Sequence, residues 1–283
     1  MDSTIVPPEG GLLGELRQIC QLERDLGTEL GLEAVPASAH PGLIAARAAI
    51  SGSPSEEEPR IIFAADGIKS AATIPWDRLE ERQFESDDAL ELVRYVVIEL
   101  VRNVEEHSRA ESGASVRVAH RSHPTRIAIG VADRGVGVRR SLEQFHHPPD
   151  DRSAVTLAVA PGVSGATSRA GGNQVNAGAG LFFARGIAAL SGLSFLLLSG
   201  SAAWHLEPET VDTLSLHNGE VVALGHSRWD GTVALVDLPT APRYSRDDFF
   251  SKLQDAYFRH VKDAKKEFDR RRSLVGEAFF RNR

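Results

Sequence analysis

The stretch Glu99–His107, which reads Glu-Leu-Val-Arg-Asn-Val-Glu-Glu-His, constrains this chain most because it sets polar groups in an otherwise apolar helix. Apolar residues recur at helical spacing over residues 90–104 and cover most of the circumference, which is typical of a buried helix. Glu99 and Asn103 are four residues apart and share one face. A buried acid and a buried amide need polar partners. This face therefore predicts a ligand such as hydrated Mg²⁺ carrying a nucleotide, unless the helix end emerges into solvent.

The composition excludes several classes of protein. The chain has 283 residues, of which 42% are hydrophobic and 25% charged, as in an ordinary globular protein. A net charge of −7 argues against a general affinity for nucleic acid. No apolar run reaches the roughly 18 residues that span a bilayer, and we find no secretion signal. The one cysteine, Cys20, permits neither an intrachain disulfide nor a cysteine metal cluster, so we expect a cytoplasmic protein without membrane or nucleic-acid partners.

The region before the Glu99 helix differs from the rest of the chain. Residues 9–33 are predicted to be helical, with leucine and isoleucine on one stripe. Residues 35–60 are rich in Pro, Ala, Ser and Glu, and within them residues 51–59 read as a linker or mobile loop. A short strand is expected over residues 60–64. We assign residues 1–85 to an N-terminal helical and irregular extension.

Alternating hydrophobicity follows the Glu99 helix. Residues 115–119 and 126–132 alternate and are joined by His123-Pro124-Thr125, which predicts a β-hairpin. Further along, we expect short helices and strands at the following positions: a helix over 153–160, a glycine-rich mobile loop over 162–180, a helix over 181–190, and strands over 193–199, 220–224 and 232–238. This order predicts an α+β fold, a two-layer sandwich in which helices cover one face of a sheet.

The C-terminal tail is basic. Residues 241–283 form a third segment, and from Arg243 onward it holds 12 Lys and Arg against 7 Asp and Glu. Apolar residues including Phe250, Leu253 and Tyr257 form a stripe, which predicts a basic amphipathic helix. Such a helix can pack on its own domain, on a dimer mate, or on an acidic partner. The tail and residues 9–33 are the segments through which we would expect a homodimer.

Two glycine motifs lie at the ends of predicted elements. Asp133-x-Gly135-x-Gly137 follows a strand, where a carboxylate can accept a hydrogen bond from an exocyclic amine such as that of adenine. Gly178-Ala179-Gly180-Leu181 opens a helix, whose exposed N–H groups and dipole favour an anion such as phosphate. Neither is a Walker-type loop or a dinucleotide fingerprint.

The order of these motifs, closed by Gly231-Thr232 at the start of the last strand, resembles the GHKL superfamily of ATP-binding domains. That superfamily includes gyrase B subunits, large heat-shock chaperones, sensor histidine kinases and MutL. The resemblance covers residues 86–240, and the Glu99–Ala110 segment is most similar to kinase catalytic domains and anti-sigma serine kinases. It implies a Bergerat-type sandwich with a mixed β-sheet, and ATP and Mg²⁺ as ligands.

The resemblance also implies roles for matching residues. Asn103 would bind Mg²⁺, and Glu99 would orient or activate the attacking water or help to position the metal. Asp133 would bind the adenine N6 amine, with Thr232 near the same edge, and residues 139–177 would form the ATP lid. Three further groups are implied: Gly135 and Gly137 shaping the adenine pocket, Gly178, Gly180 and Leu181 at the phosphates, and His107 reaching toward them.

Three functions fit this sequence. The first is an ATP-dependent regulatory or signalling protein whose nucleotide-gated lid controls contact with a protein partner. The second is a kinase acting on a separate protein, either an anti-sigma-type serine kinase or a histidine kinase without its own phosphoacceptor, because His40 before Pro41 is poorly placed for a helix. The third is a non-hydrolysing pseudo-ATPase scaffold. Glu106 stands where many of the kinases carry a basic residue, and a second acid there needs Mg²⁺ or a pairing such as Arg102.

Overall fold

The structure is a computed structural model. It describes residues 60–61, 84–110, 113–120, 125–165, 178–206, 219–224 and 228–281. The predicted helix over 9–33 and the predicted linker over 51–59 lie outside the described residues. The strand expected at 60–64 is present over its first two residues, and residues 62–64 lie outside the described part.

The described strands form one seven-stranded sheet in the order β1-β2-β3-β7-β4-β5-β6. The strands are β1 (Arg60–Ile61), β2 (Ala114–His120), β3 (Arg126–Asp133), β4 (Phe195–Gly200), β5 (Ala202–Leu206), β6 (Glu220–Ala223) and β7 (Trp229–Pro239). The predicted hairpin is confirmed as β2 and β3, and the last strand, β7, lies in the middle of the sheet between β3 and β4. Chain-distant segments are thereby brought together at the sheet centre.

The expectation of a mixed sheet is wrong for the described strands, because every pairing among them is antiparallel. β7 pairs antiparallel with both β3 and β4. Consequently β3 and β4 run in the same direction, but they are separated by β7 and are not hydrogen-bonded to each other. The insertion of the last strand between them explains why a helical connection from β3 to β4 produces no parallel pair.

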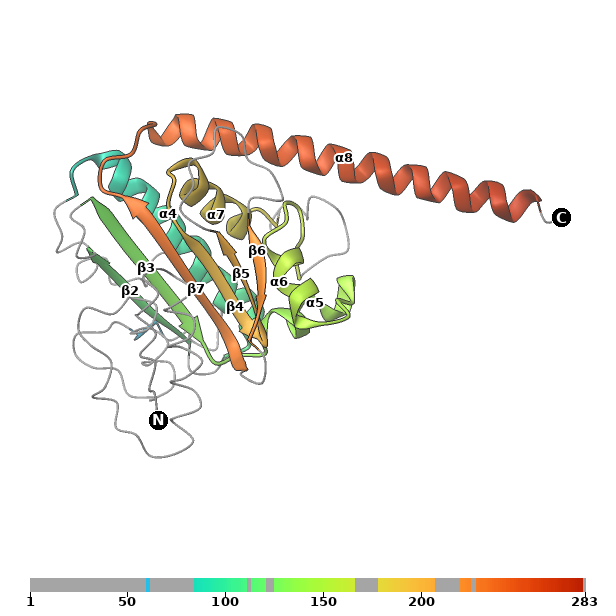
Figure 1. Cartoon of the computed structure of the whole chain (residues 1–283), viewed down its shortest axis with the longest axis horizontal. Coiled ribbons are helices and arrows are strands. Elements are labelled where there is room, and N and C mark those ends of the chain that lie inside the picture. The colour runs from blue at the N-terminus through green and yellow to red at the C-terminus, as the bar shows by residue number, and fades with distance from the viewer. Residues whose placement is uncertain are drawn as a thin grey trace, which may run out of the picture.

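The helices are α4 (Asp87–Asn103), the π-helical segment η3 (Val104–Ser108), α5 (Gly137–His146), α6 (Asp151–Ala158), α7 (Gly180–Leu190) and α8 (Arg246–Arg281). Figure 1 shows α4 and α7 crossing one side of the sheet, α5 and α6 near one end of it, and α8 running along the top. In the part of the chain that the structure describes, no helix is both long and apolar enough to cross a membrane. The architecture is α+β, as predicted.

Local sequence signals explain where α4 begins. The side chain of Ser86 accepts a hydrogen bond from the Ala89 N–H at 3.2 Å, and Asp87 and Asp88 occupy the first turn, where the helix dipole favours negative charge. The apolar residues of α4 are buried, among them Leu92, Val96 and Val97. The buried residues recur every three or four positions and form one face of α4, so burial covers less of the circumference than the periodicity predicted.

The core lies between the sheet and the helices. Alternate residues of the central strands face α4 and α7, including Ile129 on β3, Val236 on β7 and Phe195 on β4, which lie side by side in the strand register. Residues on the opposite side of these strands are also excluded from solvent, namely Leu196, Leu198, Val233 and Leu235. The central strands are therefore apolar on both faces, which removes the alternation that would have identified them from sequence.

Strand β5 and helix α5 were not predicted from the sequence. Strand β5 follows β4 through a tight turn at Gly200, whose φ is +61°, so the two strands read as one apolar segment. Helix α5 occupies residues that were expected to belong to the lid. Only Val138 and Leu142 are buried in it, and ten residues with two buried positions give little periodic signal.

Helix α8 confirms the predicted C-terminal helix. Its first half packs on the domain through buried Phe249, Leu253 and Ala256. The ring of Phe250 meets Tyr95 of α4 edge-on at 4.7 Å between centroids, and Tyr257 meets Phe183 of α7 at 6.2 Å. In Figure 1 the second half of α8 extends beyond the sheet and the other helices. The helix thus continues past the surface that its first half covers.

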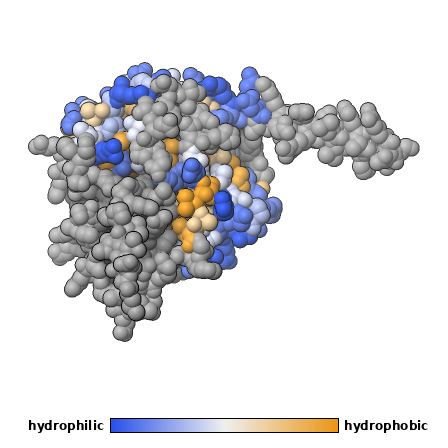
Figure 2. All heavy atoms as spheres, in the orientation of Figure 1, coloured by the Kyte–Doolittle hydropathy of each residue, from blue (hydrophilic) through white to orange (hydrophobic). Residues whose placement is uncertain are grey.

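The coloured surface in Figure 2 is mainly hydrophilic, with an apolar patch near the middle of the face shown. Among large hydrophobic side chains of the described part, Phe258 of α8 is the exposed one, at 64% of its full accessibility. It stands next to Tyr257, which is buried. Phe249, which is fully buried, and Phe258 therefore provide a matched pair of phenylalanines on α8 for measuring how strongly the helix is held.

We expect Phe249→Ala to lower the free energy of unfolding by about 3 kcal/mol or more, because it leaves a cavity where a fully buried ring stood. Urea denaturation followed by circular dichroism measures this. The control is Phe258→Ala on the same helix, for which we expect a change within about 0.5 kcal/mol. Equal effects of the two substitutions would show that α8 is not docked through Phe249.

Candidate functional site

A cavity of about 230 Å³ lies where the end of α4 and η3, the end of β3 and the start of α7 meet. Nine of the ten residues predicted to bind a nucleotide line it: Glu99, Asn103, His107, Asp133, Gly137, Gly178, Gly180, Leu181 and Thr232. They come from four separate stretches of sequence. The remaining residue, Gly135, does not line this cavity.

The wall formed by α4 ends in a π-helical turn. The helix changes from α to π geometry at Val104, and Arg109 stops it in the left-handed conformation with φ 53°. A π turn is wider than an α turn and often occurs at functional sites. Here it carries Glu106 and His107 to the cavity and brings the Ser108 carbonyl against the turn after β3, where it accepts the Val136 N–H at 2.7 Å.

Gly135 affects the cavity without lining it. A Cβ atom built on it would lie on the carbonyl oxygen of Ser108, so a side chain would push η3 away from β3. Gly135 therefore lets two walls of the cavity approach each other. Gly137, with φ +74°, turns the chain into α5 and lines the cavity.

Asp133 is the most buried acid of the site, at 1% exposure. One carboxylate oxygen accepts the Gly135 N–H at 2.7 Å, and Thr232, its neighbour on β7, also donates to the carboxylate. Burial raises the pKa of Asp133 to about 6, and these hydrogen bonds oppose the rise. The carboxyl is held rigidly at the floor of the cavity, where it can accept a hydrogen bond from a ligand.

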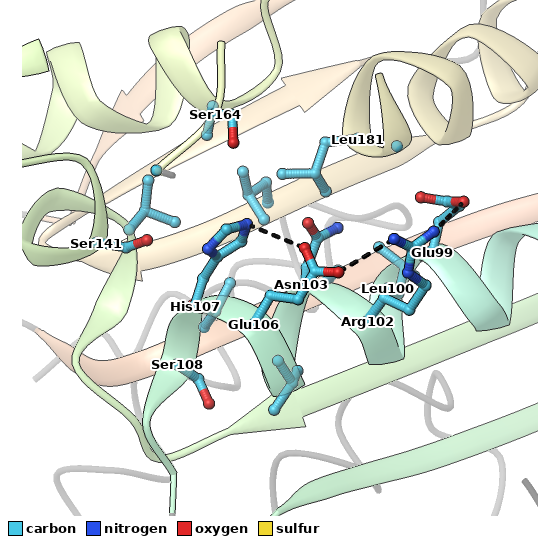
Figure 3. A pocket seen from close by; sticks show the side chains of 18 of the residues that line it. Glu99, Leu100, Arg102, Asn103, Glu106, His107, Ser108, Ser141, Ser164 and Leu181 are labelled. Carbon is cyan, nitrogen blue, oxygen red and sulfur yellow. Dashed lines mark hydrogen bonds and ion pairs between the residues drawn. The ribbon is translucent and has the colours of Figure 1, made fainter. Parts of the chain in front are cut away.

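Four polar side chains form a row along α4 and η3 (Figure 3). Arg102 lies between two acids, with its guanidinium 3.6 Å from Glu99 and 3.1 Å from Glu106. The Glu106 carboxylate is also 3.8 Å from the His107 ring. Burial raises the pKa of Glu99, Arg102 lowers it and Glu106 raises it. Burial also lowers the pKa of His107, which keeps the imidazole mostly neutral at pH 7.

Asn103 lies on the same helix as this row, and its burial is only partly compensated. Its side-chain nitrogen is inaccessible to solvent and has no hydrogen-bond partner among the described residues. Buried amide groups are normally hydrogen-bonded, and leaving one unpaired costs about 1–3 kcal/mol. Asn103 also lines the cavity, so another part of its side chain faces the space that a ligand would occupy.

The start of α7 forms the wall opposite Glu99. A Cβ built on Gly180 would lie 2.5 Å from a carboxylate oxygen of Glu99, so a side chain at this position would require the Glu99 carboxylate to move. The Gly162 N–H donates to the Gly178 carbonyl at 3.0 Å, which joins the two ends of the segment that includes residues 166–177. The N-cap residue of α7, Ala179, offers no side-chain acceptor to the first N–H groups of the helix, and Ala179, Gly180 and Leu181 line the cavity.

The predicted lid, residues 139–177, is partly helical. It contains nearly all of α5 and the whole of α6, and residues 166–177 lie outside the described part. Asp150 caps α6 by accepting the Ser153 N–H at 2.7 Å. Helix α5 in this segment was not predicted, whereas the helix expected at 153–160 is present as α6.

Much of the cavity wall consists of residues that were not predicted from the sequence. Apolar residues line one side: Leu100, Val131, Val138, Leu142, Ala158, Val163, Leu197 and Ala234. Three serines, Ser108, Ser141 and Ser164, also line the cavity. These residues have ordinary core or loop character, so no sequence signal distinguished them from the rest of the core. A cavity with an apolar side and a few convergent polar groups is the usual form of a small-molecule site.

The described residues offer few ligands to a metal ion. Within the described residues, no group of three or more His, Cys, Asp or Glu side chains could hold one. Mg²⁺, however, keeps several waters and is commonly held by one or two protein oxygens together with substrate phosphates. Asn103 and Glu99, on successive turns of α4 and both at the cavity, suit that mode.

Comparisons of the chain with protein-family models, with curated proteins and with solved structures found no match. The interpretation of the cavity therefore depends on the chemistry of its residues. That chemistry combines a buried acid, a buried amide, a glycine-opened helix and an apolar wall.

The raised pKa of Asp133 predicts how stability depends on pH. Its folded-state pKa of about 6 lies above the ~3.9 of an unfolded chain, so its contribution is fully present below about pH 4 and is lost as the pH rises through about 6. Between about pH 4 and pH 7.5, wild type should lose about 2–3 kcal/mol relative to Asp133→Asn.

Urea unfolding at both pH values measures the difference. The control is Asp230→Asn, whose side chain is 64% exposed. A difference between wild type and Asp133→Asn that does not change with pH would contradict the environment assigned to Asp133.

Proposed function

We propose that this chain is an ATP- and Mg²⁺-binding regulatory or signalling protein of the GHKL type, with a Bergerat-type nucleotide fold. One observation carries the proposal: nine residues from four separate motifs, selected from sequence alone, line one cavity. Independent motifs with only structural roles would have no reason to share a cavity. The nucleotide would enter with its base toward Asp133 and its phosphates toward α7.

The base end is supported by Asp133 and the apolar wall. A carboxylate at the floor of a mostly apolar pocket can accept a hydrogen bond from the adenine N6 amine, while the wall covers the faces of the ring. Thr232 donates to the same carboxylate and holds its orientation. Guanine carries a carbonyl oxygen in place of that amine, and two acceptors would then face each other, which gives adenine its advantage.

The phosphate end is supported by Asn103, Glu99 and the start of α7. An oxygen ligand from Asn103 would hold Mg²⁺, which would neutralise the phosphates when bound. The uncapped N-terminus of α7, an eleven-residue helix, offers N–H groups and a positive dipole end to an anion. Glu99, whose pKa is raised by burial, would accept a proton from an attacking water.

A regulatory role is supported by the packing of α8. Tyr95 lines the cavity one turn before Glu99, and its ring packs edge-on against Phe250 of α8. Phe183, three residues into α7, contacts both Phe250 and Tyr257. The two helices whose ends build the cavity therefore hold α8. A nucleotide that shifted either helix would change how α8 is presented to a protein partner.

Isothermal titration with ATP and Mg²⁺ tests the proposal. Wild type is expected to bind ATP and to prefer it to GTP. In Asp133→Asn, the side-chain NH₂ group replaces a carboxylate oxygen, so two hydrogen-bond donors face each other. ATP affinity should therefore fall about tenfold or more, and the preference for adenine should disappear. Asp230→Asn, outside the cavity, should bind like wild type. Unchanged ATP affinity in Asp133→Asn would refute this placement of the base.

Glu99→Gln tests whether the nucleotide is hydrolysed. Removing a general base typically lowers the rate by about 10²–10⁴-fold, so phosphate release should nearly stop while ATP binding persists. Malachite-green phosphate detection measures the rate, with Glu91→Gln as the control because Glu91 is exposed on the same helix. Hydrolysis that survives Glu99→Gln would assign the base elsewhere, and a wild type that binds without turnover would favour the scaffold function.

A further inference from the structure

The charges at the phosphate end of the cavity are unusual for a site that is to receive a polyphosphate. Glu99 and Glu106 both line it, and both are carboxylates of the same helical segment. Among the described residues that line the cavity, Arg102 is the one that carries a permanent positive charge. Because burial lowers the pKa of His107, that ring adds little charge at neutral pH.

Arg102 is shared between the two acids. Its Nη2 donates to a Glu106 oxygen at 3.1 Å, and its Nη1 lies 3.6 Å from a Glu99 oxygen. A guanidinium has five N–H donors in a planar fork, so these two contacts leave donors for a further anion. The side chain is 37% exposed, which leaves it able to turn toward a ligand.

Arg102 lies near the end of the cavity where the phosphates would bind, and not near the end where the base would bind. Its partner Glu99 is the acid against which Gly180 and the start of α7 pack. Asp133, at the opposite end, binds the turn after β3 and Thr232. A ligand with its anionic end at α7 would therefore bring that end to the Arg102–Glu99 side of the cavity.

We infer that Arg102 is the phosphate-binding cation of this site and that Glu106 is its internal competitor, which a nucleotide phosphate must displace. This rests on the proposed function, because it concerns the same cavity and the same ligand. The phosphate replaces the Glu106 carboxylate on the guanidinium, and Arg102 stays charge-paired before and after binding. Glu106 thereby weakens binding of every phosphorylated nucleotide and leaves the uncharged nucleoside unaffected.

Alternative roles make different demands on the two residues. If Arg102 served only to hold the helix together, its loss would affect adenosine and ATP alike. If Glu106 served as a metal ligand, its loss would weaken ATP binding in Mg²⁺. The competitor role alone requires opposite effects of the two substitutions, both confined to ligands that carry phosphate.

The experiment titrates adenosine and ATP, each with Mg²⁺, into wild type, Arg102→Gln, Arg102→Lys and Glu106→Gln. Arg102→Gln should weaken ATP binding about tenfold or more, as expected for loss of a charged hydrogen-bond donor, and change adenosine binding less than about twofold. Arg102→Lys should restore part of the loss, since it keeps the charge without the planar fork. Glu106→Gln should tighten ATP binding about threefold or more.

Glu105→Gln is the matched control. It removes the same charge from the neighbouring residue, which does not line the cavity, so ATP affinity should stay within about twofold of wild type. If Glu105→Gln and Glu106→Gln increased the affinity for ATP equally, loss of a negative charge at long range would explain the increase. That result would overturn the competitor role. Weaker ATP binding in Glu106→Gln would overturn it as well.

The outcomes separate the two proposals. If wild type binds adenosine and ATP while Arg102→Gln binds both as wild type does, the inference about Arg102 fails and the proposed function stands. If wild type binds neither ligand, the proposed function fails and the inference fails with it. Circular dichroism and urea unfolding of each variant confirm that a lost affinity is not lost folding.

Discussion

The site depends on the close contact between the end of α4 and the turn that follows β3. The Ser108 carbonyl accepts the Val136 N–H, and Gly135 leaves room for that carbonyl where a side chain would occupy its place. This contact closes one side of the cavity and places Asn103 and Asp133 on its walls, although thirty residues separate them in the chain. The π turn of η3 allows the contact, because a regular α turn would aim Ser108 and His107 in other directions.

Burial then determines the chemistry of the polar residues. The same desolvation raises the pKa values of Asp133 and Glu99 and lowers that of His107, so the cavity holds its groups closer to neutrality than they would be in water. Arg102 opposes this effect at Glu99, and hydrogen bonds oppose it at Asp133. Few groups in the cavity carry a full charge, so a bound anion would need a counter-ion. A nucleotide bound together with Mg²⁺, as proposed above, would meet that need.

Packed aromatic side chains connect the cavity to α8. Aromatic rings of Tyr95, Phe183 and Phe250 join α4, α7 and α8 into one packed layer, and the first of these rings also lines the cavity. Packed aromatic layers respond to displacement by shifting as units, because interiors have little free space. The part of α8 that extends past the domain in Figure 1 is the element best placed to carry such a shift outward.

The sequence by itself determined the α+β class, the hairpin, the helices α4, α7 and α8, and nine residues of the cavity. These could be predicted because apolar periodicity and glycine motifs are local properties of the chain, and because polar residues on a buried helix are costly unless they serve a ligand. Tertiary structure alone decided the rest. The insertion of β7 between β3 and β4, which replaces the expected mixed sheet by antiparallel pairs, depends on contacts between distant strands. So does the role of Gly135, whose constraint comes from Ser108, and the apolar wall, whose residues read as ordinary core until the fold places a cavity beside them.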